Sequence, residues 1–73
     1  DVLTDKESGA ALRMVRIEKN IKQEAMAKLM NISRYKLSRI ETGKAAISLP
    51  MLIAFCEAIG ISVVDIINIL EKI

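Results

Sequence analysis

The chain has 73 residues, 52% of them hydrophobic, and a formal net charge of +2. A single domain this small has to fold on apolar packing alone, because a lone cysteine (Cys56) excludes an intrachain disulfide and the lack of histidine excludes a Cys/His zinc site; no cofactor is expected. No apolar run is long enough to span a membrane and the N-terminus has no signal-peptide layout, which predicts a cytoplasmic protein without a membrane partner.

Residues that accept a left-handed backbone divide the chain into five apolar-periodic segments. These residues are Asn20, Asn31, Gly43 and Gly60. Asparagine or glycine directly after a periodic segment is typical of a helix C′ position. The sequence therefore predicts an all-α fold of five helices, with residues 1–8 as an N-terminal extension and residues 9–73 as one domain.

The first two helices are predicted over residues 9–19 and 23–30. Ser8 is the expected N-cap of the first helix. Their inward faces carry Leu12, Val15, Met26, Ala27 and Met30. All four methionines, including Met14, are expected to fill the core rather than to form a binding site.

The third helix is predicted to follow Ser33 as its N-cap and to end before Gly43. Leu37 and Ile40 face inward from it. Their spacing of three residues places both side chains on one helical face.

The last two helices are predicted within residues 48–72. Ser48 is the expected cap of the fourth helix, and Pro50 lies in its first turn, where the missing N–H costs little. Ser62 opens the fifth helix in a variant of the capping box that ends at Asp65. The buried stripe of the fourth helix is Leu52, Phe55, Cys56 and Ile59. Cys56 is therefore expected to be a packed thiol rather than a redox sensor.

Positive charge is concentrated in the middle of the chain. Residues 13–44 hold nine basic and three acidic side chains, a local charge of +6, whereas the flanks together carry −4. Such a basic centre indicates an anionic partner, although an ordinary solvated lysine-rich surface is the alternative.

Residues 23–41 combine the features of a helix-turn-helix. Ala27 is small where the second helix has to let the third cross closely. Asn31 supplies the sharp turn, and Ile32 lies beneath it. Each feature alone is common, but together at these spacings they are the signature of a DNA-binding helix-turn-helix.

The chain resembles the Cro and phage-repressor-like (XRE-type) family of bacterial helix-turn-helix domains, above all in the stretch RIEKNIKQEAMAKLMNISRYKLSRIETGK (residues 16–44). The resemblance covers about residues 10–70. It implies a five-helix repressor-like domain, with the helix-turn-helix formed by helices 2 and 3, that binds double-stranded DNA sequence-specifically as a transcriptional regulator.

Three positions depart from the family pattern. Asn20 and Asn31 stand where the family usually has glycine, which is conservative because asparagine tolerates positive φ. Lys22 replaces the usual Ser or Thr cap of the second helix, which loses about 1 kcal/mol of capping but adds a cation near phosphate.

The outward face of the third helix supplies the expected base-reading residues. Arginine can bond guanine O6 and N7 together, and tyrosine can pack on a thymine methyl group. With the apolar face turned inward, the outward residues are Arg34, Tyr35, Lys36, Ser38 and Arg39, and the four other than Ser38 are the expected base readers. The resemblance implies base reading at the same four positions. The alternative is that they are ordinary exposed side chains.

A second set is expected to contact the DNA backbone. In the family that the chain resembles, a glutamine at the position of Gln23 bonds a phosphate beside the N-terminus of the second helix. Gln23 has an alternative interpretation as a plain surface residue, and Lys44 as a solvated loop lysine. The expected backbone contacts are Lys22, Gln23, Ser33, Ser38, Thr42 and Lys44.

The resemblance also implies an ion pair. Arg16 and Glu41 match the positions at which the family pairs an arginine of helix 1 with the glutamate that ends the recognition helix. We expect the pair to be partly buried and to fix the orientation of that helix. Neither residue is a catalytic candidate, and without histidine, a glycine-rich phosphate loop or a convergent carboxylate pair the chain is not expected to be an enzyme.

The C-terminal third is too apolar for a small monomer. From residue 47 to residue 73, 18 of 27 residues are apolar, and two short helices cannot turn all of them inward. We expect a homodimer interface, with a frayed apolar terminus as the alternative. The expected interface residues are Ile61, Val64, Ile67 and Leu70.

Two functions are consistent with these features of the sequence. The first is a homodimeric repressor that reads a palindromic operator through the major groove, with two recognition helices about 34 Å apart. The second is a protein-interaction module, such as an antitoxin that binds a toxin through its apolar C-terminal face.

Overall fold

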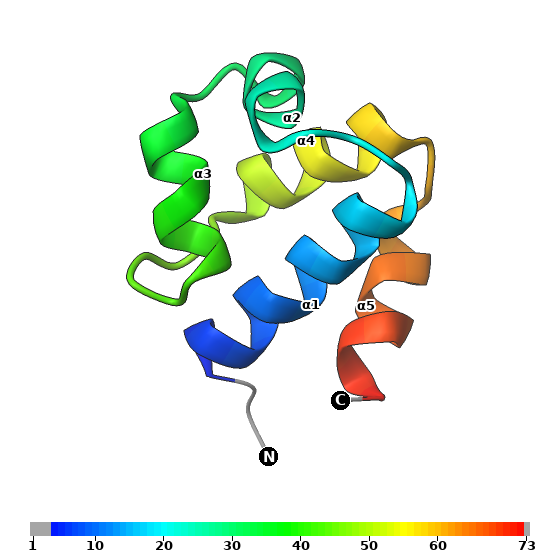
Figure 1. The fold of residues 1–73 in the computed structure, drawn as a ribbon. Coiled ribbons are helices and arrows are strands. Elements are labelled where there is room, and N and C mark those ends of the chain that lie inside the picture. Colours follow the sequence, from blue (N-terminus) through cyan, green and yellow to red (C-terminus); the bar gives the residue numbers. More distant parts are fainter. Residues whose placement is uncertain (1–3, 73) are drawn as a thin grey trace.

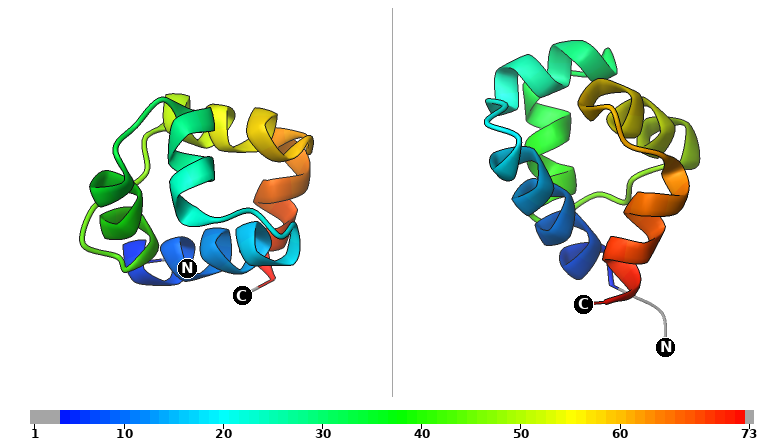
Figure 2. Two further views of the ribbon diagram at one scale, coloured as in Figure 1. Left: turned by 45° about the horizontal axis from the view of Figure 1, so that its top comes forward. Right: turned by 90° about the vertical axis from the view of Figure 1, so that its right-hand side faces the viewer.

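The computed structural model describes residues 4–72, which form five α-helices and no strand. The helices are α1 (Asp5–Glu18), α2 (Gln23–Met30), α3 (Arg34–Glu41), α4 (Leu49–Ile59) and α5 (Val63–Glu71). α1 packs against α3 and α5, and α2 packs against α3 and α4. α3 and α5 lie on opposite sides of the molecule, with α1 and α4 between them (Figures 1 and 2). The predicted all-α fold of five helices is confirmed.

α1 begins at Asp5, four residues earlier than predicted. Its N-cap is Thr4, whose hydroxyl accepts a hydrogen bond from the N–H of Glu7, while the Glu7 carboxylate accepts one from the N–H of Thr4. This capping box satisfies two backbone donors at once. Its hydrogen bonds, from the Thr4 backbone and then from the Thr4 side chain, lower the pKa of Glu7.

The prediction that Ser8 caps the first helix was therefore wrong. Ser8 lies inside α1, and its N–H donates to the carbonyl of Thr4 at 2.9 Å. Residues 5–8 belong to the helix and not to an extension, because the reciprocal bonds of the Thr4–Glu7 box start the helix one turn before Ser8.

The other helix ends agree with the sequence. Positive φ angles, from 58° to 79°, occur at Asn20, Asn31, Gly43 and Gly60. Ser33, Ser48 and Ser62 each accept a hydrogen bond from the backbone N–H three residues ahead. α2 differs, because Lys22 has no side-chain acceptor and forms no cap bond among residues 4–72.

The core gathers side chains from all five helices. Its buried apolar residues are Ala11, Leu12, Val15, Met26, Ala27, Met30, Leu37, Ile40, Phe55, Cys56 and Ile66. Leu52, Ile59 and Met51 are partly buried against this cluster. Met14 is 62% exposed, so the prediction that it fills the core was wrong. It precedes Val15, which faces inward, and a helix turns successive side chains by about 100°.

At Gly9 the backbone of α1 lies directly against the backbone of α3. A Cβ at this position would clash with the carbonyl oxygen of Ile40 and would lie 3.2 Å from the carbonyl carbon of Glu41. Only glycine lets the two backbones meet this closely. The C-terminal end of α3 therefore rests directly on α1.

No single helix within residues 4–72 is long and apolar enough to cross a membrane. α4 and α5 meet the length and hydropathy required for a span only when taken together, and they are bent by 105° at the break between them.

Candidate nucleic-acid interface

The turn between α2 and α3 sets how α3 crosses the molecule. Asn31 adopts the left-handed conformation, with φ 58° and ψ 42°, and the N–H of Ile32 donates to the carbonyl of Ala27 at 3.0 Å. The Ile32 side chain packs against the core below the turn. Ala27 is 2% exposed, and its small side chain leaves room for the crossing. α3 is thus held at the edge of the molecule, with one face free (Figure 1).

That free face carries the four predicted base-reading residues. Arg34, Tyr35 and Lys36 are exposed, and Arg39 is half-buried. The guanidinium of Arg39 lies 5.8 Å from the centre of the Tyr35 ring, and its Nη2 donates to the carbonyl of Lys44 at 3.1 Å. A cation over an aromatic face is attracted by the ring quadrupole. Tyr35 and Arg39 therefore form a pair at the centre of this face.

The predicted backbone contacts surround the same helix. Lys22, Ser33, Thr42 and Lys44 are exposed, whereas Gln23 and Ser38 are half-buried. The Ser33 hydroxyl accepts from the N–H of Lys36 at 3.0 Å, which leaves its own hydrogen free to donate. The hydroxyl of Thr42 donates to the carbonyl of Ser38 at 2.8 Å, so Thr42 offers an acceptor more readily than a donor.

A shallow hollow of about 440 Å³ opens beside the N-terminus of α2. Its lining residues are Arg16, Ile17, Lys22, Gln23, Glu24 and Arg34. The first backbone N–H groups of α2 have no side-chain cap among the described residues and lie at the positive end of the helix dipole. Cationic side chains beside free N–H groups suit a phosphate.

A buried ion pair lies behind this surface. Arg16 Nε is 2.7 Å from Glu41 Oε2, and Arg16 Nη2 donates to Glu41 Oε1 at 3.0 Å. Arg16 Nη1 also donates to the carbonyl of Ile21 at 2.7 Å. The predicted pair is present and is more deeply buried than expected, with side-chain exposures of 8% and 1%. The Arg16 side chain therefore links α1 to the loop that follows it and to the end of α3.

Gln23 extends this network to the surface in a way that the sequence did not indicate. Its Nε2 donates to Glu41 Oε1 at 3.0 Å, and its Oε1 accepts from Arg34 Nε at 3.3 Å. The three residues are separated by 18 and 11 positions, so no local spacing could have shown that they meet. A hydrogen-bond chain therefore runs from the buried carboxylate to the first residue of α3.

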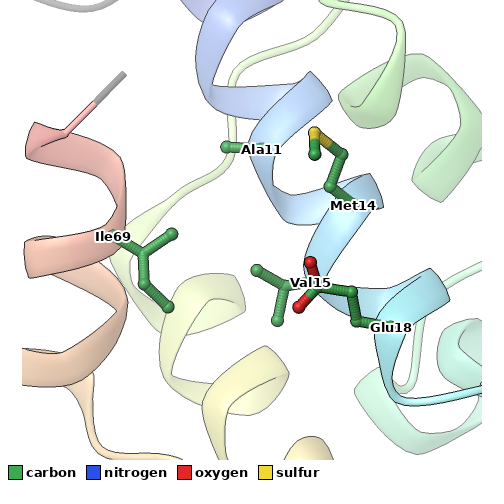
Figure 3. A pocket seen from close by; sticks show the side chains of 5 residues that line it. All are labelled: Ala11, Met14, Val15, Glu18 and Ile69. Atoms are coloured by element: carbon green, nitrogen blue, oxygen red, sulfur yellow. The ribbon is translucent and has the colours of Figure 1, made fainter.

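A second, smaller hollow lies away from α3. It measures about 210 Å³, sits between α1 and α5, and is lined by Ala11, Met14, Val15, Glu18 and Ile69 (Figure 3).

Burial raises the pKa of the Cys56 thiol, as expected for a packed side chain. Within residues 4–72, no three His, Cys, Asp or Glu side chains lie close enough to share a metal ion.

The α2–turn–α3 unit, with its basic free face, defines a helix-turn-helix DNA-binding domain. The chain belongs to the XRE-type helix-turn-helix family, whose sequence profile, described as helix-turn-helix, matches residues 12–66. A comparison with curated protein sequences gives no match.

Solved structures with the same fold include regulators. Two crystal structures of the clp gene regulator ClgR from Corynebacterium glutamicum are 31% and 30% identical to this chain, with TM-scores of 0.88 and 0.87. They cover 97% and 99% of this chain, which in turn covers 76% and 94% of theirs. The restriction-modification controller protein C.AhdI from Aeromonas hydrophila is 26% identical, with a TM-score of 0.79 and coverages of 85% and 94%. The chain is a DNA-binding transcriptional regulator.

Proposed function

We propose that this regulator is a homodimeric repressor that reads a palindromic operator by placing α3 in the major groove. The observation that carries the proposal is the free face of α3, on which Arg34, Tyr35, Lys36 and Arg39 stand together while Leu37 and Ile40 anchor the opposite face in the core. A short helix held in this way can reach base edges with its first turns.

The residues around α3 divide into two roles. Arg34 and Lys36 can donate to guanine, Tyr35 can meet a thymine methyl group, and Arg39 can share its guanidinium between Tyr35 and a base. Backbone phosphates would be held by Lys22, Gln23, Ser33, Ser38, Thr42 and Lys44, with the N-terminus of α2 as the anchor. Phosphate contacts set the register, and base contacts set the sequence preference.

Replacement of Arg34 with alanine is expected to weaken binding to the operator by about 1–3 kcal/mol and to relax the preference at one position of each half-site. Replacement of Lys44 with alanine should instead weaken binding to all sequences alike and lower the log–log salt slope by about 1, because one phosphate contact is lost. Fluorescence titrations of upstream DNA at several salt concentrations measure both effects.

Lys72→Ala is the matched control, since it removes the same charge from the end of α5 and should change neither quantity. A log–log salt slope near zero for the unaltered protein would overturn the proposal, because contacts to phosphate must release counterions.

The apolar side chains of α5 support the homodimer. Val64 is 66% exposed and Ile67 is 43% exposed, while Ile61 and Leu70 are half-buried beside them. α5 lies on the opposite side of the molecule from α3 (Figure 1). A twofold axis at α5 would thus cover the apolar side chains and leave both recognition helices free, as an operator with two half-sites requires.

The double variant Val64→Glu, Ile67→Glu is expected to be monomeric in analytical ultracentrifugation, because four carboxylates would have to be buried at the twofold axis. Its affinity for a full palindrome should fall to that for a single half-site. The matched control, Leu49→Glu with Ile53→Glu, alters two exposed apolar residues of α4 and should leave the oligomeric state unchanged. A monomeric unaltered protein at micromolar concentration would refute the dimer.

A further inference from the structure

Arg39 is joined to the loop after α3 by its backbone and by its side chain. Its carbonyl accepts hydrogen bonds from the N–H of Lys44 at 2.8 Å and from that of Ala45 at 3.2 Å. Its guanidinium Nη2 in turn donates to the carbonyl of Lys44 at 3.1 Å. The backbone bonds hold the Lys44 carbonyl in place, and this carbonyl holds the end of the Arg39 side chain. Arg39 is accordingly half-buried, although it belongs to the free face of α3.

The loop that holds Arg39 rests on the first turn of α1 (Figure 1). A Cβ at Gly43 would lie only 2.5 Å from the Cα of Lys6 and 2.8 Å from its Cβ. The loop and the start of α1 are therefore in direct contact, and the loop has no space behind it into which it could retreat. The Lys44 carbonyl is thus a supported acceptor rather than part of a free loop.

The same guanidinium covers one face of the Tyr35 ring. Arg39 follows Tyr35 by four residues, which places the two side chains next to each other on α3. The Cζ of Arg39 lies over the ring at 5.8 Å from its centre, inside the range of about 6 Å for a cation–π contact. Tyr35 is 72% exposed, so its ring has room for several orientations unless a neighbour holds it. With Arg39 against one face, the opposite face and the edge of the ring are left to meet DNA.

The two contacts of Arg39 depend on the planar shape of a guanidinium. Such a group can face an aromatic ring and at the same time donate hydrogen bonds in its own plane. A lysine ammonium carries the same charge, but it is compact and strongly hydrated and has no flat face. Charge and positioning can therefore be separated by replacing Arg39 with lysine.

We propose that Arg39 is a specificity-determining positioning residue, which holds the Tyr35 ring in the orientation that meets a base and is itself held by the Lys44 carbonyl. The inference rests on the proposed function, since it takes Tyr35 as a base reader. It gives Arg39 a role in addition to base reading, for which its Nε and Nη1 are not used by the bond to Lys44. A ring that is already held loses less freedom when it packs on a thymine methyl group.

The test uses Arg39→Lys, which keeps the charge and removes the planar group. Binding is measured to the selected operator and to variants with each base pair of the half-site changed in turn. The preference at the base pair that Tyr35→Leu identifies should fall about two- to fivefold, as expected for an exposed cation–π contact. The log–log salt slope should stay the same, because the charge is retained. In the double variant, the two losses at that base pair should not add, because both act through the Tyr35 ring.

Lys44→Ala is the matched control, because it removes the Lys44 side chain and keeps the carbonyl that holds Arg39. It should weaken binding to all sequences alike and leave the preference at the Tyr35 base pair unchanged.

Three results would overturn the positioning role: an unchanged preference at this base pair in Arg39→Lys, additive losses in the double variant, or a Tyr35→Leu protein that loses preference at no base pair. Each of these would leave the repressor proposal standing, whereas a salt slope near zero for the unaltered protein would remove both proposals.

A measurement on the DNA-free protein tests the contact between the two side chains directly. Protons that lie over the face of an aromatic ring are shifted upfield in NMR spectra. The side-chain δ protons of Arg39 should therefore resonate upfield of those of Arg13, an exposed arginine of α1, and Tyr35→Leu should remove the difference. Equal shifts for the two arginines in the unaltered protein would contradict the contact.

Discussion

Replacement of Glu41 with alanine is expected to lower the free energy of unfolding by about 3–5 kcal/mol. The substitution leaves the guanidinium of Arg16 buried without its counter-charge, and also removes the acceptor of Gln23. A single hydrophobic core in a chain of this size rarely supplies more than about 3–5 kcal/mol of stability, so this loss would leave much of the protein unfolded at 37 °C. Urea denaturation followed by circular dichroism measures the change.

Replacing both residues of the ion pair separates the cost of leaving one charge unpaired from the net contribution of the pair to the free energy of unfolding. The double variant Arg16→Met, Glu41→Leu should be less destabilised than Glu41→Ala, because two apolar side chains can fill the space without a stranded charge. DNA binding by this double variant should nevertheless be weakened, since α3 loses the contact that orients it. A Glu41→Ala protein within 1 kcal/mol of the unaltered one would contradict the burial of the pair.

Replacement of Gly9 with alanine is expected to destabilise the domain by about 3 kcal/mol, at the upper end of what overpacking costs. Alanine is a better helix former than glycine by about 1 kcal/mol, so the same substitution on an open face of a helix would stabilise the protein. Here the new methyl group meets the backbone of Ile40, which cannot move aside as a side chain could. α1 and α3 must separate, and the Arg16–Glu41 pair would be stretched.

Gly60→Ala provides the control for this prediction. Gly60 has a φ of 74° and nothing within 4 Å of the position that a Cβ would take, so alanine there meets conformational strain alone. It should cost about 1 kcal/mol. Thermal unfolding of both variants gives the comparison, and a Gly9→Ala protein as stable as Gly60→Ala would show that α1 can move away from α3 at little cost.

The element pattern of this protein follows from local chemistry and could be read from the sequence. Asn31 and Gly60 end helices because they accept positive φ, and Ser33, Ser48 and Ser62 begin them because a hydroxyl caps a free N–H. The Thr4–Glu7 capping box is equally local, but Ser8 is a competing cap candidate that lies nearer to the first inward-facing residue, Leu12.

The free face of α3 was also predictable, since helical periodicity separates Leu37 and Ile40 from Arg34 and Tyr35. Tertiary structure decided two other features. These are the close approach at Gly9 and the bonding of Gln23 to both Glu41 and Arg34. Each depends on how α1, α2 and α3 cross, and crossing distances are set by packing between residues far apart in the chain. Local chemistry was enough to place α2 to α5 and the free face of α3, whereas the link between that face and the buried ion pair comes only from the packing of the helices.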